Sequence, residues 1–116
     1  KEYVADGASF SCQSGALADV STVEAYCEWM KGLVAGPLPD GHYTLHSSSW
    51  DEAASTASFI ATFHGTHTGE GGPVPPTNKS TNSDYVYTLK MDASGKVASM
   101  TKIWNDSFAL AELGWA

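Results

Sequence analysis

Four strand-like segments in series constrain the fold of this chain most strongly. They are HYTLHSSSW (42–50), STASFIATFHGTHTG (55–69), STNSDYVYTLKMD (80–92) and VASMTKIWN (97–105). The connections between them are too short for crossover helices, which parallel neighbours would need. The last connection, DASGK, has the composition of a hairpin turn, with Gly95 available for a positive φ. We therefore predict an antiparallel meander.

Two helical patterns flank the meander. In STVEAYCEWMKGLVAG (21–36), Ser21 and Glu24 have the spacing of a capping box. Apolar residues recur on one face at Val23, Tyr26, Cys27, Met30, Leu33 and Val34. The Gly36-Pro37 pair ends this helix. SFALAELGW (107–115) predicts a short C-terminal helix, with Gly114 as its C-cap.

The N-terminal region adds one more strand. Residues 1–5 resemble the end of a helix, Asp6-Gly7 is typical of a turn, and residues 8–13 follow as a strand. A loop, SGALADV, leads to the first complete helix. The order of elements predicts an α+β fold in which the helices cover one face of an antiparallel sheet.

Length and charge limit the classes of function. The 116 residues form one domain, residues 1–116, and no run of 18 apolar residues would span a membrane. The net charge is −7 with only 6 Lys plus Arg, which argues against nucleic acid and anionic membrane surfaces as partners. No secretory signal is visible, so we expect a cytoplasmic protein.

The cysteines and histidines do not form a recognisable site. Cys12 and Cys27 are predicted to be free, buried thiols, although the sequence leaves a single bridge open. In a regular strand His64 and His67 point to opposite faces, and His42 and His46 lie roughly 13 Å apart. Neither pair can chelate one ion, so we predict no metal site.

The Gly-rich stretch GTHTGEGG does not match a phosphate-binding loop. It lacks the Gly-Lys-Ser/Thr ending, precedes a Pro-rich segment rather than a helix, and carries Glu70, which would repel phosphate. Residues 69–78 are instead interpreted as a stiff connection between two long strands. We predict that this connection forms a rim of whatever the sheet encloses.

Three segments in order, GTHTGEGGPVPPT, DYVYTLKMDASGKV and MTKIWNDSFALAELGW, resemble the SnoaL-like polyketide cyclase branch of the NTF2-like superfamily. The match covers residues 59–115 closely and residues 8–50 more loosely. The resemblance implies a cone, in which a curved antiparallel sheet wraps around helices and encloses a cavity. It also implies a homodimer formed through the outer face of the sheet, and chemistry without a cofactor.

One departure concerns the long first helix of the family, of which KEYVADG resembles only the last turn. Either preceding residues lie outside this numbering, or the cone is open on that side. An open cone would expose an apolar patch, which monomers rarely tolerate.

The resemblance assigns a general acid/base to the aromatic-x-Asp motif, which is Asp106 here. Burial in an apolar cavity would raise the pKa of such a carboxylate and improve it as a base. The alternative is that Asp106 only caps the last helix. Alternation places Met100, Lys102, Trp104 and Asp106 on one side of the last strand. Trp104, Tyr87 and either His64 or His67 are predicted to shape the pocket.

The leading functional hypothesis is a cyclase or isomerase that acts on a small hydrophobic carbonyl or cyclic substrate. A second hypothesis is a non-catalytic ligand-binding or assembly module, because one fold hosts both. A third is a hydrolase or dehydratase, such as an epoxide hydrolase, which would need polar residues around a water site.

Overall fold

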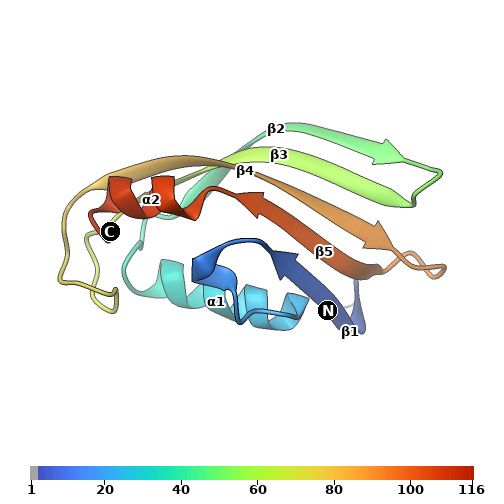
Figure 1. The fold of residues 1–116 in the computed structure, drawn as a ribbon, viewed down its shortest axis with the longest axis horizontal. Helices are drawn as coiled ribbons and strands as arrows, with labels where there is room; N and C mark the ends of the chain where they lie inside the picture. Colours follow the sequence, from blue (N-terminus) through green and yellow to red (C-terminus); the bar gives the residue numbers. More distant parts are fainter. Residues whose placement is uncertain (1–2) are drawn as a thin grey trace.

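A five-stranded sheet in the order β1-β5-β4-β3-β2 frames the molecule (Figure 1). The computed structural model describes residues 3–116. Its elements are β1 (Val4–Cys12), the 3-10 turn η1 (Gly15–Leu17), α1 (Val23–Ala35), β2 (His42–Asp51), β3 (Thr56–Thr66), β4 (Ser80–Met91), β5 (Val97–Trp104) and α2 (Asp106–Leu113). The fold is the predicted α+β cone, with a curved sheet and helices on its inner side.

Strands β2 to β5 form the predicted antiparallel meander. The prediction of an entirely antiparallel sheet is wrong at one edge, because β1 pairs with β5 in parallel. Between β1 and β2 the chain passes through η1 and α1 and reaches the opposite edge of the sheet. The direction of β1 is therefore set by this long connection and not by a hairpin.

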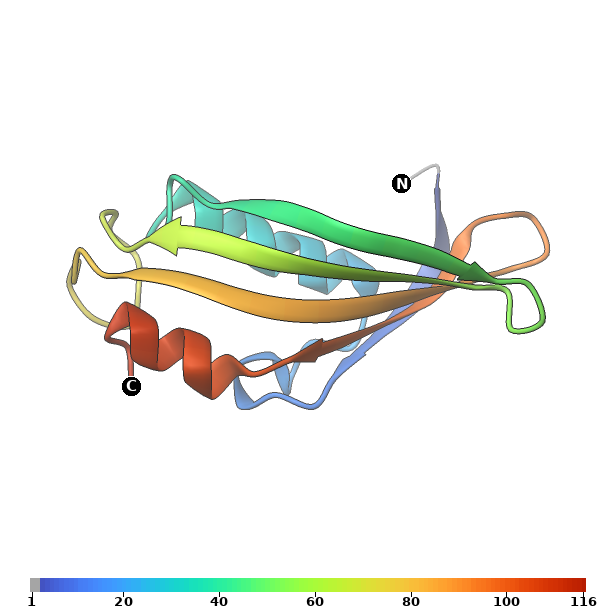
Figure 2. The ribbon, with the colours of Figure 1, turned by 90° about the horizontal axis from the view of Figure 1, so that it is seen from above.

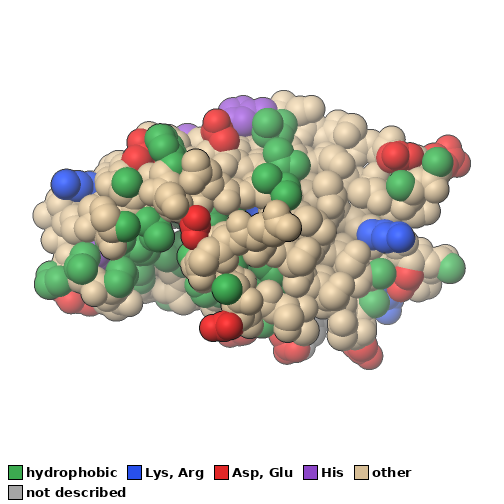
Figure 3. Space-filling view, in the orientation of Figure 1, with side chains coloured by type: hydrophobic (Ala, Val, Ile, Leu, Met, Phe, Trp, Pro, Cys, Tyr) green, Lys and Arg blue, Asp and Glu red, His purple; other side chains and the backbone are tan. Residues whose placement is uncertain are grey.

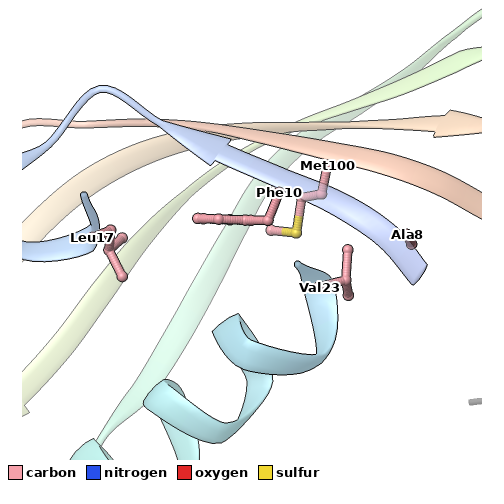
Figure 4. Packing of buried hydrophobic residues seen from close by; sticks show 5 residues of the cluster. All are labelled: Ala8, Phe10, Leu17, Val23 and Met100. Atoms are coloured by element: carbon pink, nitrogen blue, oxygen red, sulfur yellow. The ribbon is translucent and has the colours of Figure 1, made fainter. Parts of the chain in front are cut away.

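Helix α1 lies beneath the concave side of the sheet, and the long strands pass over it (Figure 2). The buried cluster that joins α1 to the sheet contains Ala8, Phe10, Leu17, Val23 and Met100. Phe10 and Met100 point from β1 and β5 toward the start of α1 (Figure 4). Burying a side chain of this size contributes about 1.5–3 kcal/mol, so this cluster fixes the helix against β1 and β5.

The N-terminal strand begins earlier than predicted. Val4 and Ala5, expected in a last helical turn, belong to β1, while residues 1 and 2 lie outside the described range. The Asp6-Gly7 turn is a bulge within the strand. Gly7 has a φ of +72°, and the register with β5 shifts between Val4 and Ser9. The Asp6-Gly7 pair therefore forms a bulge instead of a turn, and β1 continues to pair with β5 on both sides of it.

Helix α1 begins one residue later than predicted. Thr22, not Ser21, is the N-cap, and its hydroxyl accepts a hydrogen bond from the Ala25 amide at 3.1 Å. The helix ends at Ala35, before Gly36, as predicted. At the end of α2, Gly114 is the predicted C-cap, with a left-handed φ of +76°.

Edge strand β2 has three large apolar side chains that are exposed to solvent. Tyr43, Leu45 and Trp50 are 63%, 48% and 56% exposed. Their partners in β3 are Phe63, Ala61 and Ala57, so all three belong to the concave side of the sheet. These side chains form an exposed apolar patch at the β2 edge of the sheet.

Both cysteines are free thiols, as predicted, but their burial differs. Cys12 is partly buried under the sheet edge, whereas Cys27 is exposed, so the prediction that it is buried is wrong. Cys27 lines an open groove between α1 and the first residues of β1. Within residues 3–116, no helix combines the length and apolar character that a membrane crossing requires.

Candidate functional site

A mostly apolar pocket lies between α1, the concave face of β3 to β5, and α2. Its wall includes Trp29 from α1, Phe63 from β3, Tyr85 from β4 and Leu110 from α2, with Trp115 just beyond α2. The cavity volume is about 60 Å³. One water needs about 10–15 Å³ on this measure, so the pocket has room for a ligand the size of a few waters.

Lys102 is the one charged side chain in the wall of this pocket, as far as residues 3–116 show. It lies on β5 between Met100 and Trp104, and alternation turns all three toward the inside. Only 5% of Lys102 is exposed. Its Nζ donates a hydrogen bond to the Tyr26 hydroxyl oxygen at 3.0 Å.

Four aromatic rings surround the Lys102 ammonium. Nζ lies 4.6 Å from the Trp104 centroid, 4.9 Å from Tyr85, 5.0 Å from Tyr26 and 6.0 Å from Trp29. Among the described residues, no carboxylate lies within ion-pair distance of it. The cation is therefore held by ring faces and one hydroxyl, which are weaker partners than a carboxylate.

Burial changes the acidity of these groups. Desolvation lowers the pKa of Lys102 from 10.5 to about 8, although neighbouring Cys12 acts in the opposite direction. Desolvation raises the pKa of Tyr26 above its usual range, and raises that of Tyr85 to about 12. At neutral pH the amine thus exchanges readily between ammonium and free base. Such a group can give or take a proton inside an apolar pocket.

Thr81, Ser83 and Trp104, three further polar side chains of the wall, are bonded within the protein. Thr81 Oγ1 donates to Glu112 Oε1 at 2.8 Å, and Trp104 Nε1 donates to Ser83 Oγ at 3.3 Å. The predicted placement of Trp104 agrees with the structure, since its ring lines the pocket. These bonds hold the wall rigid and leave the Lys102–Tyr26 pair as its reactive feature.

Asp106 occupies a different environment from the one expected of a buried base. Its Oδ2 accepts hydrogen bonds from the Ala16 amide at 3.0 Å and the Ser14 hydroxyl at 2.8 Å. These donors lower its pKa below 3.8 rather than raising it. The residue is the first of α2 and joins that helix to η1. Ala16 belongs to the pocket wall, whereas Asp106 is not among the lining residues within the described range.

The helix-cap interpretation of Asp106 is wrong by one residue. Asn105 is the N-cap of α2, and its Oδ1 accepts from the Phe108 amide at 3.2 Å. Both residue types favour this position, so the sequence alone does not separate them. Asp106 in the first turn still interacts favourably with the helix dipole.

Within the described range, the other predicted pocket residues, Tyr87, His64 and His67, are not among the residues that line the pocket, although Tyr87 pairs with Lys102 across β4 and β5. Tyr87 is partly buried and stacks on Phe59, with ring centroids 4.9 Å apart. His64 lies on the opposite, convex face of the sheet, where it stacks on His42 at 4.8 Å and bonds Asn82 at 2.6 Å. Histidines of this face are visible along the upper edge of Figure 3.

His67 follows the end of β3 and is fully buried. Its Nδ1 accepts from Trp115 Nε1 at 2.8 Å and from the Thr77 amide at 3.3 Å, which leaves the ring proton on Nε2. The ring thus ties the 67–79 connection to Trp115, a wall residue of the pocket. No group of three His, Cys, Asp or Glu side chains within residues 3–116 is placed to hold a metal ion.

Lys102 is the functional candidate that sequence reasoning did not select. The signal was present: alternation puts this lysine on the same face as Met100 and Trp104. A lysine flanked by two core-facing residues on a strand is either buried or emerges at a rim. The sequence could not show that four aromatic rings from three different elements would meet around it.

Comparison with known proteins identifies the fold through solved structures and not through sequence. No family model and no curated protein matches the sequence. Solved structures do match. IdmH, a candidate polyketide cyclase from Streptomyces antibioticus, has a TM-score of 0.77 at 21% identity over 98% of this chain and 84% of its own. A candidate SnoaL-like polyketide cyclase from Jannaschia sp. CCS1 has a TM-score of 0.78 at 15% identity, over 99% and 76%.

AclR, a candidate hydroxylase from Streptomyces galilaeus, has a TM-score of 0.77 at 20% identity over 99% of this chain and 71% of its own. Further matches are described as ketosteroid isomerase-like and NTF2-like. At these identities the likeness concerns the fold. The resemblance to the SnoaL-like branch is confirmed at that level, and the chain has the NTF2-like cone fold.

Proposed function

We propose that this protein binds a small apolar carbonyl compound and catalyses proton transfer next to the carbonyl, as a cyclase or isomerase does. The observation that carries the proposal is the Lys102–Tyr26 pair at the wall of an apolar pocket. Polyketide cyclases among the structures of the same fold support the class of substrate.

The chemistry follows from the positions of the two groups. A carbonyl oxygen that entered the pocket would meet the Lys102 ammonium, whose single hydrogen bond to Tyr26 leaves donors free. A donor in a water-poor site stabilises the negative charge that develops on that oxygen. The adjacent C–H bond becomes more acidic as a result.

Two groups are candidates for the base that removes the proton. Asp106, which the resemblance suggests, is ionised at neutral pH but is a weak base with a lowered pKa. It would have to exchange its bonds to Ser14 and Ala16 for contact with the ligand. The free-base form of Lys102 already faces the pocket, and if it is the base, the Tyr26 hydroxyl takes over the role of donor to the carbonyl oxygen.

The experiment measures enolisation directly. Cyclohexanone, which suits the size of the pocket, is incubated with the protein in D₂O, and deuterium uptake at its α-carbons is followed by NMR. We expect the protein to accelerate exchange. Lys102→Met should reduce the acceleration on the order of a hundredfold, the usual size of one acid–base contribution. Tyr26→Phe should reduce it less, because the ammonium remains.

Asp106→Asn decides between the two bases, because it abolishes exchange only if that carboxylate is the proton acceptor. Binding of cyclohexanone is followed in parallel by the fluorescence of Trp29, Trp104 and Trp115, which line the pocket. Without either binding or exchange, the proposed function fails.

The second candidate is a non-catalytic ligand-binding module. It is favoured by the position of Asp106, which leaves no carboxylate in the pocket wall within the described residues. Cyclohexanone binding without exchange in every variant would select this candidate over the enzyme.

A further inference from the structure

We propose that the Lys102 amine forms a covalent imine with small aldehydes that enter the pocket. This inference rests on the proposed function, because it needs the same pocket to admit a carbonyl compound. It adds a specific bond at a specific atom, Nζ of Lys102.

The first requirement is an uncharged amine. Lys102 is 5% exposed, and no carboxylate within residues 3–116 pairs with it. The titratable groups that face it from neighbouring elements are Cys12 from β1, Tyr26 from α1 and Tyr85 from β4. Burial raises the pKa of each of these three, so they remain neutral near pH 8. Cys12 still acts to raise the pKa of Lys102, but less strongly than desolvation lowers it.

Burial also lowers the pKa of the Lys102 amine. Desolvation lowers its pKa to about 8, so a useful fraction is free base at neutral pH. Buried lysines in hydrophobic pockets gain nucleophilicity in this way.

The second requirement is a site that accepts the cationic product. The lone pair of Nζ attacks the carbonyl carbon, and the π electrons move to oxygen. The nitrogen then passes one of its two protons to that oxygen, which becomes a hydroxyl. The hydroxyl gains a second proton from solvent by way of Tyr26 and leaves as water, while the nitrogen lone pair forms the C=N bond of a protonated imine. This iminium carries the same charge as the ammonium it replaces. The rings of Trp104, Tyr85 and Tyr26, at 4.6–5.0 Å, surround that charge in both states.

The third requirement is proton transfer near the new bond. The Tyr26 hydroxyl already accepts from Nζ at 3.0 Å and is the nearest group able to pass a proton to the departing oxygen. It is held in place by stacking on Phe10, with centroids 4.5 Å apart. Tyr26 therefore acts as a positioning and proton-relay group, and we expect its removal to slow the bond-forming step without removing the amine.

The pocket also limits the ligand. Its space suits a short aldehyde such as pentanal. Its wall is apolar apart from Lys102, the hydroxyls of Tyr26 and Tyr85, the indole N–H groups, and the bonded Thr81 and Ser83. A charged aldehyde would lose its hydration without gaining a counter-ion. We therefore expect uncharged aldehydes and, more slowly, small ketones.

The test uses pentanal with sodium cyanoborohydride, which reduces an imine to a stable secondary amine. Intact mass and peptide mapping then locate the modification after short exposure at pH 7. The exposed lysines, Lys31, Lys79, Lys90 and Lys96, serve as internal references within the same molecule. We expect Lys102 to be modified about tenfold faster than any of them, because more of it is free base.

Two variants accompany the wild type. Lys102→Met should lose the fast modification and keep the slow ones, while Tyr26→Phe should slow modification of Lys102 severalfold. Modification spread evenly over the exposed lysines, or fast modification that persists in Lys102→Met, overturns the imine.

A non-electrophilic analogue separates the two proposals. Pentan-1-ol has the size and polarity of pentanal but cannot form an imine, and its binding is followed by tryptophan fluorescence. If pentan-1-ol binds and cyclohexanone exchanges, but Lys102 is not trapped, the imine is wrong and the proposed function stands. If neither binds and no exchange occurs, both proposals fail.

Discussion

Lys102 and Asp106 lie four residues apart, on β5 and at the start of α2, and the fold places their side chains in different environments. Lys102 loses water and gains only rings and a hydroxyl, so its charged form is disfavoured. Asp106 gains two donors at the surface of η1, so its charged form is favoured. Asp106, the acid that the resemblance singled out, is thus held in its charged form by two hydrogen bonds. Lys102 has weaker partners for its charge and is the more reactive of the two groups.

The stability role of Asp106 is testable apart from catalysis. We expect Asp106→Asn to lower the free energy of unfolding by about 1 kcal/mol at pH 7, since it weakens two charge-assisted hydrogen bonds. The folded-state pKa lies below 3.8, so this contribution is present above pH 3.8 and is lost as the pH falls further. Urea unfolding from pH 7 to pH 3 measures it.

The exposed Asp19→Asn variant is the control for the change in net charge. An Asp106→Asn curve that coincides with the Asp19→Asn curve at pH 7 would mean that the bonds to Ser14 and Ala16 contribute nothing.

The meander elements were predictable because their signals are local. The turn at residues 92–96, the ends of α1 and the Gly114 cap each depend on a few neighbouring residues. Strand β1 was only partly predictable. Its parallel pairing with β5 joins residues about ninety positions apart, and no local pattern records it.

Gly32 and Gly95 provide a matched pair of predictions at this scale. A Cβ at either position would meet no atom within 4 Å. Gly32 lies within α1, where alanine is the better helix former, so we expect Gly32→Ala to stabilise the protein by about 0.5–1 kcal/mol. Gly95 has a φ of +79° in the β4–β5 turn, so Gly95→Ala should destabilise it by about 1 kcal/mol.

Thermal unfolding of the two variants beside the wild type measures both signs. The backbone explanation fails if the two substitutions shift the midpoint in the same direction, since the space around each new methyl group is equally open.

The molecule is an elongated shell, 45 by 26 by 22 Å. Within residues 3–116 it buries one cation, Lys102, although the chain is strongly acidic. Acidic side chains are spread over the surface that Figure 3 shows, and lysines are few there. The exposed apolar side chains of β2 are the other unusual feature of the surface. The homodimer suggested by the resemblance would use the outer face of the sheet and remains a proposal, whereas these side chains of β2 lie on the concave side.

The buried cation should make global stability depend on pH in a defined direction. Below pH 8 the Lys102 amine is protonated in both the folded and the unfolded chain, and its burial costs stability. Between pH 8 and 10.5 the unfolded chain binds more protons than the folded one, so stability rises with pH. We therefore expect Lys102→Met to be more stable than wild type at pH 7, by up to about 3 kcal/mol.

That advantage should shrink as the pH rises from 8 through 10.5, because above 10.5 the wild-type amine is mostly neutral in both states. Denaturant unfolding at several pH values measures the difference, with Lys96→Met as the exposed control. Parallel profiles of wild type and Lys102→Met would show that the buried amine has an ordinary pKa.

The sequence by itself determined the strands of the meander, the two helices and their C-terminal ends, because alternation, helical periodicity and turn residues act over a few positions. It also placed Lys102 and Trp104 on the inner side of β5. Only the tertiary structure decided that Tyr26, Trp29 and Tyr85 meet at that lysine, and that Ser14 and Ala16 meet at Asp106. The reactivity of a side chain depends on desolvation and on donors that arrive from distant elements. Those contacts exist only once the sheet has curved around α1.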